Sequence, residues 1–170
     1  GRMRISDLAG GVGVTVFSQY DDRDAYYRLR SFDGGPFHLS PHGTSITSGT
    51  TSTGVSPVPG KWYQFRVEAH GTGSETLIRA RVWLDTEPEP TTWQVEAGDS
   101  SAARLTAGTV GAWATGDGVK AWDDLVVTYI ENDPFQLVTD VVGAGSVVVD
   151  PSGPDHARGT AVSLEAIAEP

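Results

Sequence analysis

The chain has 170 residues, of which 38% are hydrophobic and 20% charged, values typical of a globular protein long enough for one domain and part of a second. It contains no cysteine, which excludes disulfides, thiolate zinc sites and cysteine nucleophiles, and no apolar run near the roughly 18 residues of a membrane helix, so we expect no membrane insertion. The net charge of −10 falls entirely in residues 61–170, where 17 acidic side chains face seven basic ones, and without a basic footprint we expect no nucleic-acid partner.

Apolar and polar residues alternate at period two along most of the chain, between turns rich in glycine. This alternation predicts strands over residues 12–17, 25–32, 62–69, 76–84, 109–114 and 122–130. In the strand over 62–69 we expect Tyr63 and Phe65 to face the core and Trp62 to face away from it. His38 and His42 are expected in a loop, and residues 44–53 in a loop or a weak edge strand. No helix is expected beyond one short turn within 99–105, so the fold class is predicted to be an all-β sandwich.

The segment Asn132-Asp133-Pro134 predicts a boundary, because a proline after a strand end cannot continue the hydrogen-bonded ladder. We expect a main domain over residues 1–131 and a partial β module over residues 132–170. Short strands are predicted in this module at 135–142, 146–149 and 160–167. So short a segment is too small for an independent core, and we expect the chain to be a piece of a longer protein with further domains.

Five short segments of the main domain stand out as a set: Trp62-Tyr-Gln-Phe-Arg-Val67, Ile78-Arg-Ala-Arg-Val-Trp83, Glu89-Pro-x-x-Trp93-Gln94, Gly108-Thr-Val-Gly-Ala-Trp113 and Trp122-Asp-Asp-Leu-Val-Val127. Together with residues 11–17 and 26–30 upstream, they resemble the laminin-G-like domains of the concanavalin A-like lectin and glucanase class, over residues 4–130. The resemblance implies a concanavalin A-like jelly-roll β-sandwich of the kind found in large secreted bacterial proteins.

The C-terminal part carries a second resemblance. The segment Gly143-Ala-Gly-Ser-Val-Val-Val-Asp-Pro151, followed by Gly159-Thr-Ala-Val-Ser-Leu164, resembles the opening of an internalin-type B-repeat, a small β module that recurs along surface proteins. Both resemblances imply a multidomain bacterial protein that is secreted or held at the cell surface. They do not imply one ligand, because one fold hosts many functions.

The motifs of hydrolytic enzymes are missing from the sequence. Glucanases of this fold class carry two glutamates and an aspartate that alternate on one strand, and no Glu-x-Asp-x-(x)-Glu arrangement occurs here. Glu87 and Glu89 are two residues apart, but their proline-stiffened segment predicts a solvated loop. The sequence also lacks Gly-x-Ser-x-Gly, His-Glu-x-x-His and a phosphate-binding glycine loop. We therefore expect a non-catalytic module.

Two clusters of aspartates are candidate metal ligands: Asp21, Asp22 and Asp24 in a turn, and Asp123 and Asp124 at the start of the last strand of the main domain. Calcium takes six to eight oxygen ligands at about 2.3–2.6 Å, and the resemblance implies a structural calcium held by an aspartate of the final strand. The alternative is an aspartate paired with an arginine, for instance Arg28 or Arg30, or accepting hydrogen bonds from turn amides. Calcium is the cofactor that the sequence suggests.

Aromatic and arginine side chains supply the candidate ligand-binding residues. Exposed rings stack on the C–H faces of sugars. The five tryptophans are candidates for this role, although for each of them packing in the protein is favoured over binding. Tyr26 and Tyr27 must point to opposite sides of their strand, so at least one of them points away from the core. We expect ligand binding by Tyr26, Arg28, Arg30 and Trp62 on the concave sheet, with residues 21–24 at its rim.

These features favour a non-catalytic extracellular binding module. Its expected partner is a polysaccharide or another surface ligand, which would attach a larger bacterial protein to a glycan or a host matrix. Two alternatives stay open. One is a structural spacer or self-assembling subunit of a surface protein or filament, without a small-ligand site. The other is an enzyme accessory or degenerate glycosidase, which is least favoured because the catalytic carboxylates are missing.

Overall fold

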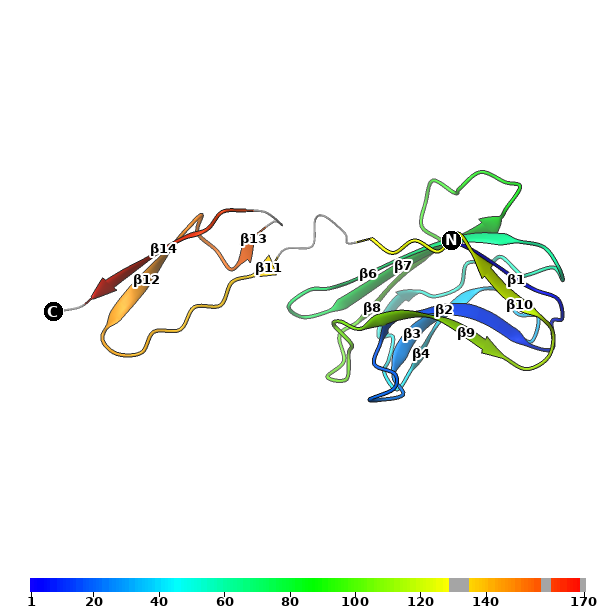
Figure 1. Cartoon of the computed structure of the whole chain (residues 1–170), viewed down its shortest axis with the longest axis horizontal. Helices are drawn as coiled ribbons and strands as arrows, with labels where there is room; N and C mark the ends of the chain where they lie inside the picture. The colour runs from blue at the N-terminus through cyan, green and yellow to red at the C-terminus, as the bar shows by residue number, and fades with distance from the viewer. Residues whose placement is uncertain (129–134, 157–159, 169–170) are drawn as a thin grey trace. The chain divides into compact units, whose positions relative to one another are not determined.

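The computed structural model describes residues 1–128, 135–156 and 160–168. These residues form antiparallel strands and no helix, so the all-β class predicted from the alternation is confirmed. Accordingly, the described part of the chain offers no helix of the length and apolarity needed to cross a membrane. Contacts divide the chain into two compact units, Gly1–Thr128 and Tyr129–Pro170, and each unit has its own sheets (Figure 1).

The first unit contains two antiparallel sheets. The six-stranded sheet has the order β10-β1-β6-β7-β8-β5, and the four-stranded sheet has the order β4-β3-β2-β9. The chain passes from one sheet to the other after β1, β4, β8 and β9, so neighbours in sequence repeatedly lie in different sheets. In chain order, the strands are β1 (Arg2–Ile5), β2 (Gly11–Ser18), β3 (Tyr26–Phe32), β4 (His38–His42), β5 (Ser48–Thr50), β6 (Tyr63–Gly71), β7 (Thr76–Leu84), β8 (Val95–Asp99), β9 (Thr109–Thr115) and β10 (Lys120–Asp123).

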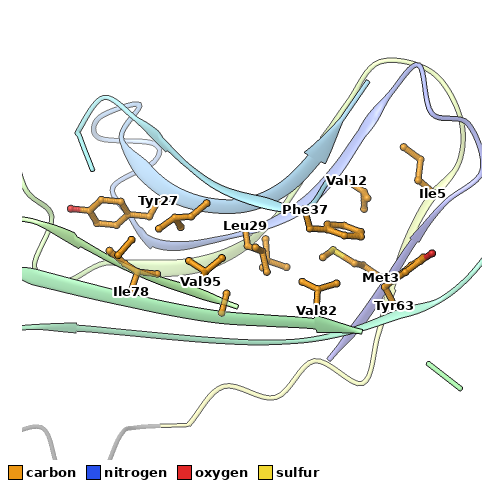
Figure 2. Close-up of a cluster of buried hydrophobic side chains, with 14 of the residues drawn as sticks. Met3, Ile5, Val12, Tyr27, Leu29, Phe37, Tyr63, Ile78, Val82 and Val95 are labelled. Carbon is orange, nitrogen blue, oxygen red and sulfur yellow. The ribbon is translucent and has the colours of Figure 1, made fainter. Parts of the chain in front are cut away.

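The core of this unit lies between the two sheets. Burial alternates along β3 and β7 with the period of a strand, so every second side chain points inward. Figure 2 shows Tyr27 and Leu29 on the four-stranded sheet, facing Ile78 and Val82 on the six-stranded sheet. Each large apolar side chain buried in this way stabilises the fold by about 1.5–3 kcal/mol. The inward-facing side chains therefore form the core, and only the outward-facing side chains could contact a ligand.

A buried polar network joins the two sheets at one end of the core. The Tyr27 hydroxyl donates to Oδ2 of Asp99 at 2.7 Å and accepts from the Leu105 amide at 3.1 Å. Thr44 Oγ1 donates to the same carboxylate at 2.8 Å, and the Ser101 amide donates at 2.9 Å. Burial alone would raise the pKa of Asp99, but these hydrogen bonds outweigh it and hold the pKa below its ordinary value. The network anchors the start of β3 to the opposite sheet.

Three local expectations from the sequence are wrong. The strand expected over 122–130 ends at Asp123, because Asp124 has a φ of 54°, which ends an extended segment; residues 129–130 lie outside the described residues. His38 and His42 lie in β4 rather than in a loop, and Pro41 is tolerated there because β4 is an edge strand. Residues 99–105 contain the end of β8 and a turn, not a helical turn.

The second unit consists of two small sheets. In one, β11 (Phe135–Gln136) pairs with β13 (Asp155–His156), and in the other, β12 (Gly145–Asp150) pairs with β14 (Ser163–Ala168). The strand expected over 135–142 is present only in its first two residues. Leu164 and Ile167 of β14 are exposed, as expected for a segment too short to build a core. The predicted boundary at Asn132-Asp133-Pro134 lies outside the described residues.

Candidate functional site

The outer face of the four-stranded sheet carries the polar and aromatic side chains of β3. Because Tyr27, Leu29 and Ser31 are buried, the alternate residues Tyr26, Arg28, Arg30 and Phe32 point outward. In Figure 2 the strands of this sheet bow so that their hollow side faces away from the core. The sequence therefore placed three of its four candidate ligand-binding residues correctly relative to one another, since Tyr26, Arg28 and Arg30 share this face.

Neighbouring strands complete the outer face. On one side, β4 places His42 opposite Tyr26 in the backbone register. On the other side, β2 pairs with β9, which brings Trp113 next to Gly13 and, across it, to Arg30. Trp113 is thus two strands away from β3, and its indole reaches the arginines by crossing over β2.

Stacking contacts link these side chains into one row. The Arg28 guanidinium carbon lies 4.7 Å from the Trp113 ring centroid and 5.6 Å from that of Tyr26. The same atom of Arg30 lies 5.4 Å from Trp113 and 5.3 Å from Phe32. At the end of the row, the Tyr26 and His42 rings are stacked with centroids 5.0 Å apart and planes inclined by 17°. We call this set the arginine–aromatic row; its members are His42, Tyr26, Arg28, Trp113, Arg30 and Phe32.

Two glycines of β2 make space for the row. A Cβ atom at Gly11 would lie 2.7 Å from Cζ3 of Trp113 and 3.1 Å from Cδ2 of Phe32, and one at Gly13 would lie 2.8 Å from Cβ of Arg30. A side chain at Gly11 would have to displace the row, and one at Gly13 would also clash with the β3 backbone, because its Cβ would lie 2.3 Å from the Leu29 carbonyl oxygen. Glycine inside a strand often marks such a close approach, and the Gly11-Val-Gly13 pattern is the signal in the sequence that could have revealed it.

Arg28 and Arg30 have no acidic partner in the described part of the chain, and neither guanidinium donates a hydrogen bond there. The Nε atom of each is buried without an acceptor, although both side chains are half-buried. Burial, and then the neighbouring charge of Arg28, lowers the pKa of Arg30. Two like charges held side by side and partly desolvated oppose folding unless something compensates them. Groups held in this way are enriched at functional sites.

The prediction that Trp62 lies on the same sheet as Tyr26 is wrong. Trp62 immediately precedes β6, which hydrogen bonds within the six-stranded sheet. The guanidinium carbons of Arg2 and Arg4 lie 5.0 Å and 4.7 Å from the Trp62 ring centroid. Because these arginines flank buried Met3 on β1, they point to the outer face of that sheet. The structure therefore does not bring Trp62 to the arginine–aromatic row.

The outer face of the six-stranded sheet also carries arginines. Arg4 is stacked on Trp62 without a carboxylate partner among the described residues, whereas the arginines of β7 have such partners. Arg79 Nε lies 3.4 Å from Glu96 Oε2, and Arg81 Nη1 lies 3.0 Å from Glu89 Oε1. Glu89 lies in addition 3.3 Å from Nε of Arg66, so it is an ion-pair partner rather than the solvated loop residue that the sequence predicted.

The aspartates proposed as metal ligands fall on different sheets. Asp21, Asp22 and Asp24 lie in the β2–β3 connection, where Oδ2 of Asp24 is 2.9 Å from Nε2 of His42. Within the described ranges no three or more His, Cys, Asp or Glu side chains form a group that could hold a metal ion. These carboxylates therefore do not assemble the oxygen-rich set that Ca²⁺ needs, and calcium binding stays a prediction.

The other two aspartates pair with an arginine that the sequence had not suggested. Arg2 lies 2.7 Å from Oδ2 of Asp123 and 3.4 Å from Oδ2 of Asp124, and it also contacts Asp85 at 3.2 Å. The hydrogen bond from Arg2 lowers the pKa of Asp123. The partner is thus on β1, beside β10 in the same sheet, rather than Arg28 or Arg30.

His42 and Phe32 complete the row but were not among the predicted site residues, and Trp113 was only one of five candidate tryptophans. Alternation along β3 places Phe32 on this face, whereas only strand pairing brings Trp113 of β9 and His42 of β4 to it. Comparison of the chain with protein-family models, with curated proteins and with solved structures found no match. The function must therefore be inferred from this face.

Proposed function

We propose that the first unit is a non-catalytic carbohydrate-binding module of a secreted or cell-surface bacterial protein, and that the arginine–aromatic row is its binding face. In this proposal the two facing sheets are a jelly roll of the concanavalin A-like class. The repeated passage of the chain between the sheets supports that topology, and the resemblance to laminin-G-like segments supports the extracellular setting.

The observation that carries the proposal is the composition of this one outer face. Its rings contribute little to the core, yet they are held in fixed positions by stacking on the arginines and, for Tyr26, on His42. Sugars present apolar C–H faces to aromatic rings and hydroxyls to guanidinium donors. The residues Tyr26 to Phe32 extend over about 20 Å of strand, which gives room for a short oligosaccharide. A row already ordered before binding loses little side-chain entropy when a ligand arrives.

A binding panel of polysaccharides tests this proposal. The whole chain is passed over immobilised neutral and charged polysaccharides, once with calcium and once with chelator. Retention of the chain, with at least a tenfold loss of affinity in Trp113→Ala, is expected because the ring at the centre of the row is removed. Trp62→Ala is the matched control, since it removes the same side chain from the other sheet and should bind like the parent.

The outcomes separate the open possibilities. Retention that disappears with chelator would support the predicted calcium and direct mutagenesis to the aspartate clusters. Equal losses in Trp62→Ala and Trp113→Ala would move the site away from the row. No retention on any polysaccharide would overturn the proposal and favour the spacer.

One observation favours the spacer as a second candidate function. The second unit exposes Val148 of β12 and Leu164 and Ile167 of β14, and it consists of two-stranded sheets that leave strand edges unpaired. Modules of this kind gain stability from neighbouring repeats. Self-association of the chain in light scattering, without binding to any polysaccharide, is the result that this alternative predicts.

A further inference from the structure

We infer that the ligand of the arginine–aromatic row is an anionic polysaccharide, whose carboxylate or sulfate groups pair with Arg28 and Arg30. The inference rests on the proposed function and adds the charge class of the ligand. It follows from how these two guanidinium groups are held.

First, neither arginine donates a hydrogen bond from its guanidinium group within the described residues. A guanidinium offers five N–H donors, and in the described ranges no carboxylate lies within 4 Å of Arg28 or Arg30 and no acceptor receives a hydrogen bond from them. A shortage of carboxylates is not the reason, because the chain has 22 acidic residues against 12 Lys and Arg. Arg79 and Arg81 on the other sheet do have partners. An anion of the ligand would therefore supply the acceptor that Arg28 and Arg30 lack.

The second step is the orientation of the two groups. Arg28 is in contact with the Tyr26 and Trp113 rings, and Arg30 with those of Trp113 and Phe32. Stacking restrains a guanidinium plane without using its N–H groups. Because Nε of each arginine is buried, the terminal Nη groups are the donors that would make two parallel hydrogen bonds to a carboxylate or sulfate. Because the residues are two apart in β3, their backbones lie about 7 Å apart on one face. The row thus offers two anion contacts at a fixed separation, beside rings for the sugar.

The third step concerns the surroundings of the row. Asp24 at its rim already accepts from His42 at 2.9 Å. The strand positions opposite Arg28 are Ser40 and Thr15, and neither is charged. Both arginines are half-buried, so an arriving anion would be less screened than at an open surface. The row offers only two arginines, which disfavours a nucleic acid, since that ligand needs many basic contacts.

The test compares polymers that differ in charge. Binding of the full chain is measured to alginate as the carboxylate polymer, to dextran sulfate as the sulfate polymer, to neutral dextran and to single-stranded DNA. We expect one of the two anionic polysaccharides to bind at least tenfold more tightly than dextran, and its binding to weaken as salt rises. A preference for alginate or for dextran sulfate identifies the anionic group.

Variants connect that preference to the row. Arg28→Gln and Arg30→Gln should each lower the affinity for the anionic polymer about tenfold, whereas Arg79→Gln, the control from the other sheet, should change it less than twofold. Arg28→Lys keeps the charge and loses the planar fork, so an affinity between those of parent and Arg28→Gln is expected. Circular dichroism confirms that each variant is folded.

Equally tight binding to dextran, or unchanged affinity in both Gln variants, would overturn the inference and leave the proposed function standing. Arginine-dependent binding that is tighter to single-stranded DNA than to any polysaccharide would overturn the polysaccharide class. Binding to none of the polymers would count against the proposed function itself.

Discussion

The two outer faces of the first unit differ in the partners of the arginines on β7 and on β3. On the six-stranded sheet, Arg79 and Arg81 have carboxylate partners at 3.4 Å and 3.0 Å. On the four-stranded sheet, Arg28 and Arg30 have no carboxylate in reach among the described residues. Stacking on aromatic rings is common to both faces, because Arg81 lies 4.0 Å from the Trp93 ring centroid. All four of these arginines are half-buried, so the difference is not one of burial.

Strand register explains the difference between Arg79 and Arg30, whereas Arg81 lies opposite Arg66 and pairs with Glu89 from the β7–β8 connection. Arg79 lies directly opposite Glu68 on one neighbouring strand and Glu96 on the other. Arg30 lies opposite His38 and Gly13. Directly opposed residues of antiparallel strands are the ones that interact, so the sequence of the neighbours decides whether an arginine is neutralised. A face whose arginines are left without acids by register is ready to accept an external anion.

The largest effect should come from reversing the charge of the row. We expect Arg28→Glu combined with Arg30→Glu to lower the affinity for the anionic polysaccharide about a hundredfold, or about 2.7 kcal/mol, because two attractions become repulsions. Titration calorimetry against the preferred polymer checks this. Arg66→Glu combined with Arg79→Glu is the control with the same change in net charge; an equal loss in that variant would show that overall charge, not this face, governs binding.

Stability should respond most to the network beneath the row. Asp99→Asn replaces a carboxylate that accepts from Tyr27, Thr44 and Ser101, and we expect it to lower the free energy of unfolding by about 2–3 kcal/mol at pH 7. Because its pKa is lower in the folded state than the unfolded value of about 3.9, its contribution is complete above that value. The contribution is lost as pH falls through the native pKa.

Urea unfolding measured between pH 7 and pH 2.5 checks both parts of this prediction. The parent should lose stability on acidification more steeply than Asp99→Asn, since the variant no longer has this carboxyl to protonate. Parallel curves for the two proteins would show that Asp99 does not couple folding to pH.

A smaller loss of stability is expected when the space under Trp113 is filled. Gly11→Val places a side chain where a Cβ atom would already lie 2.7 Å from the indole, so the ring must move. We expect a cost of about 1–3 kcal/mol in stability and at least a tenfold loss of ligand affinity. Gly60→Ala is the control for losing a glycine away from the row. A Cβ atom there would have nothing within 4 Å, although the positive φ of Gly60 strains any other residue. Ligand affinity in that control should be unchanged.

The smallest expected effect is a difference in stability between a variant of an arginine with a carboxylate partner and a variant of an arginine without a described one. Arg79→Gln removes an exposed ion pair and should cost no more than about 0.5 kcal/mol. Arg28→Gln removes one of two like charges that have no described partner, so we expect unchanged or slightly higher stability without ligand. Chemical unfolding of both variants at low and high salt measures this, and a clear loss of stability in Arg28→Gln would reveal a structural role for that charge.

Local alternation was sufficient for the fold class and for the facing of β3, although the strands that it predicted over 122–130 and 135–142 end early. Period-two patterning predicted the all-β class, and it placed Tyr26, Arg28 and Arg30 together on one outward face, because successive strand residues must point to opposite sides. It also separated buried Tyr27 from Tyr26. These statements need no knowledge of which strand lies next to which.

Strand order and register were decided only by the tertiary structure. Trp113 reaches the arginines because β9 pairs with β2, whereas Trp62 belongs to the other sheet. Asp123 pairs with Arg2, which is far from it in the sequence. Period-two alternation is compatible with many pairings, since each strand can in principle hydrogen bond with any other. The choice among them depends on how the whole core packs. The sequence thus determined the outward direction of Tyr26, Arg28 and Arg30, and long-range packing determined which side chains of other strands meet them.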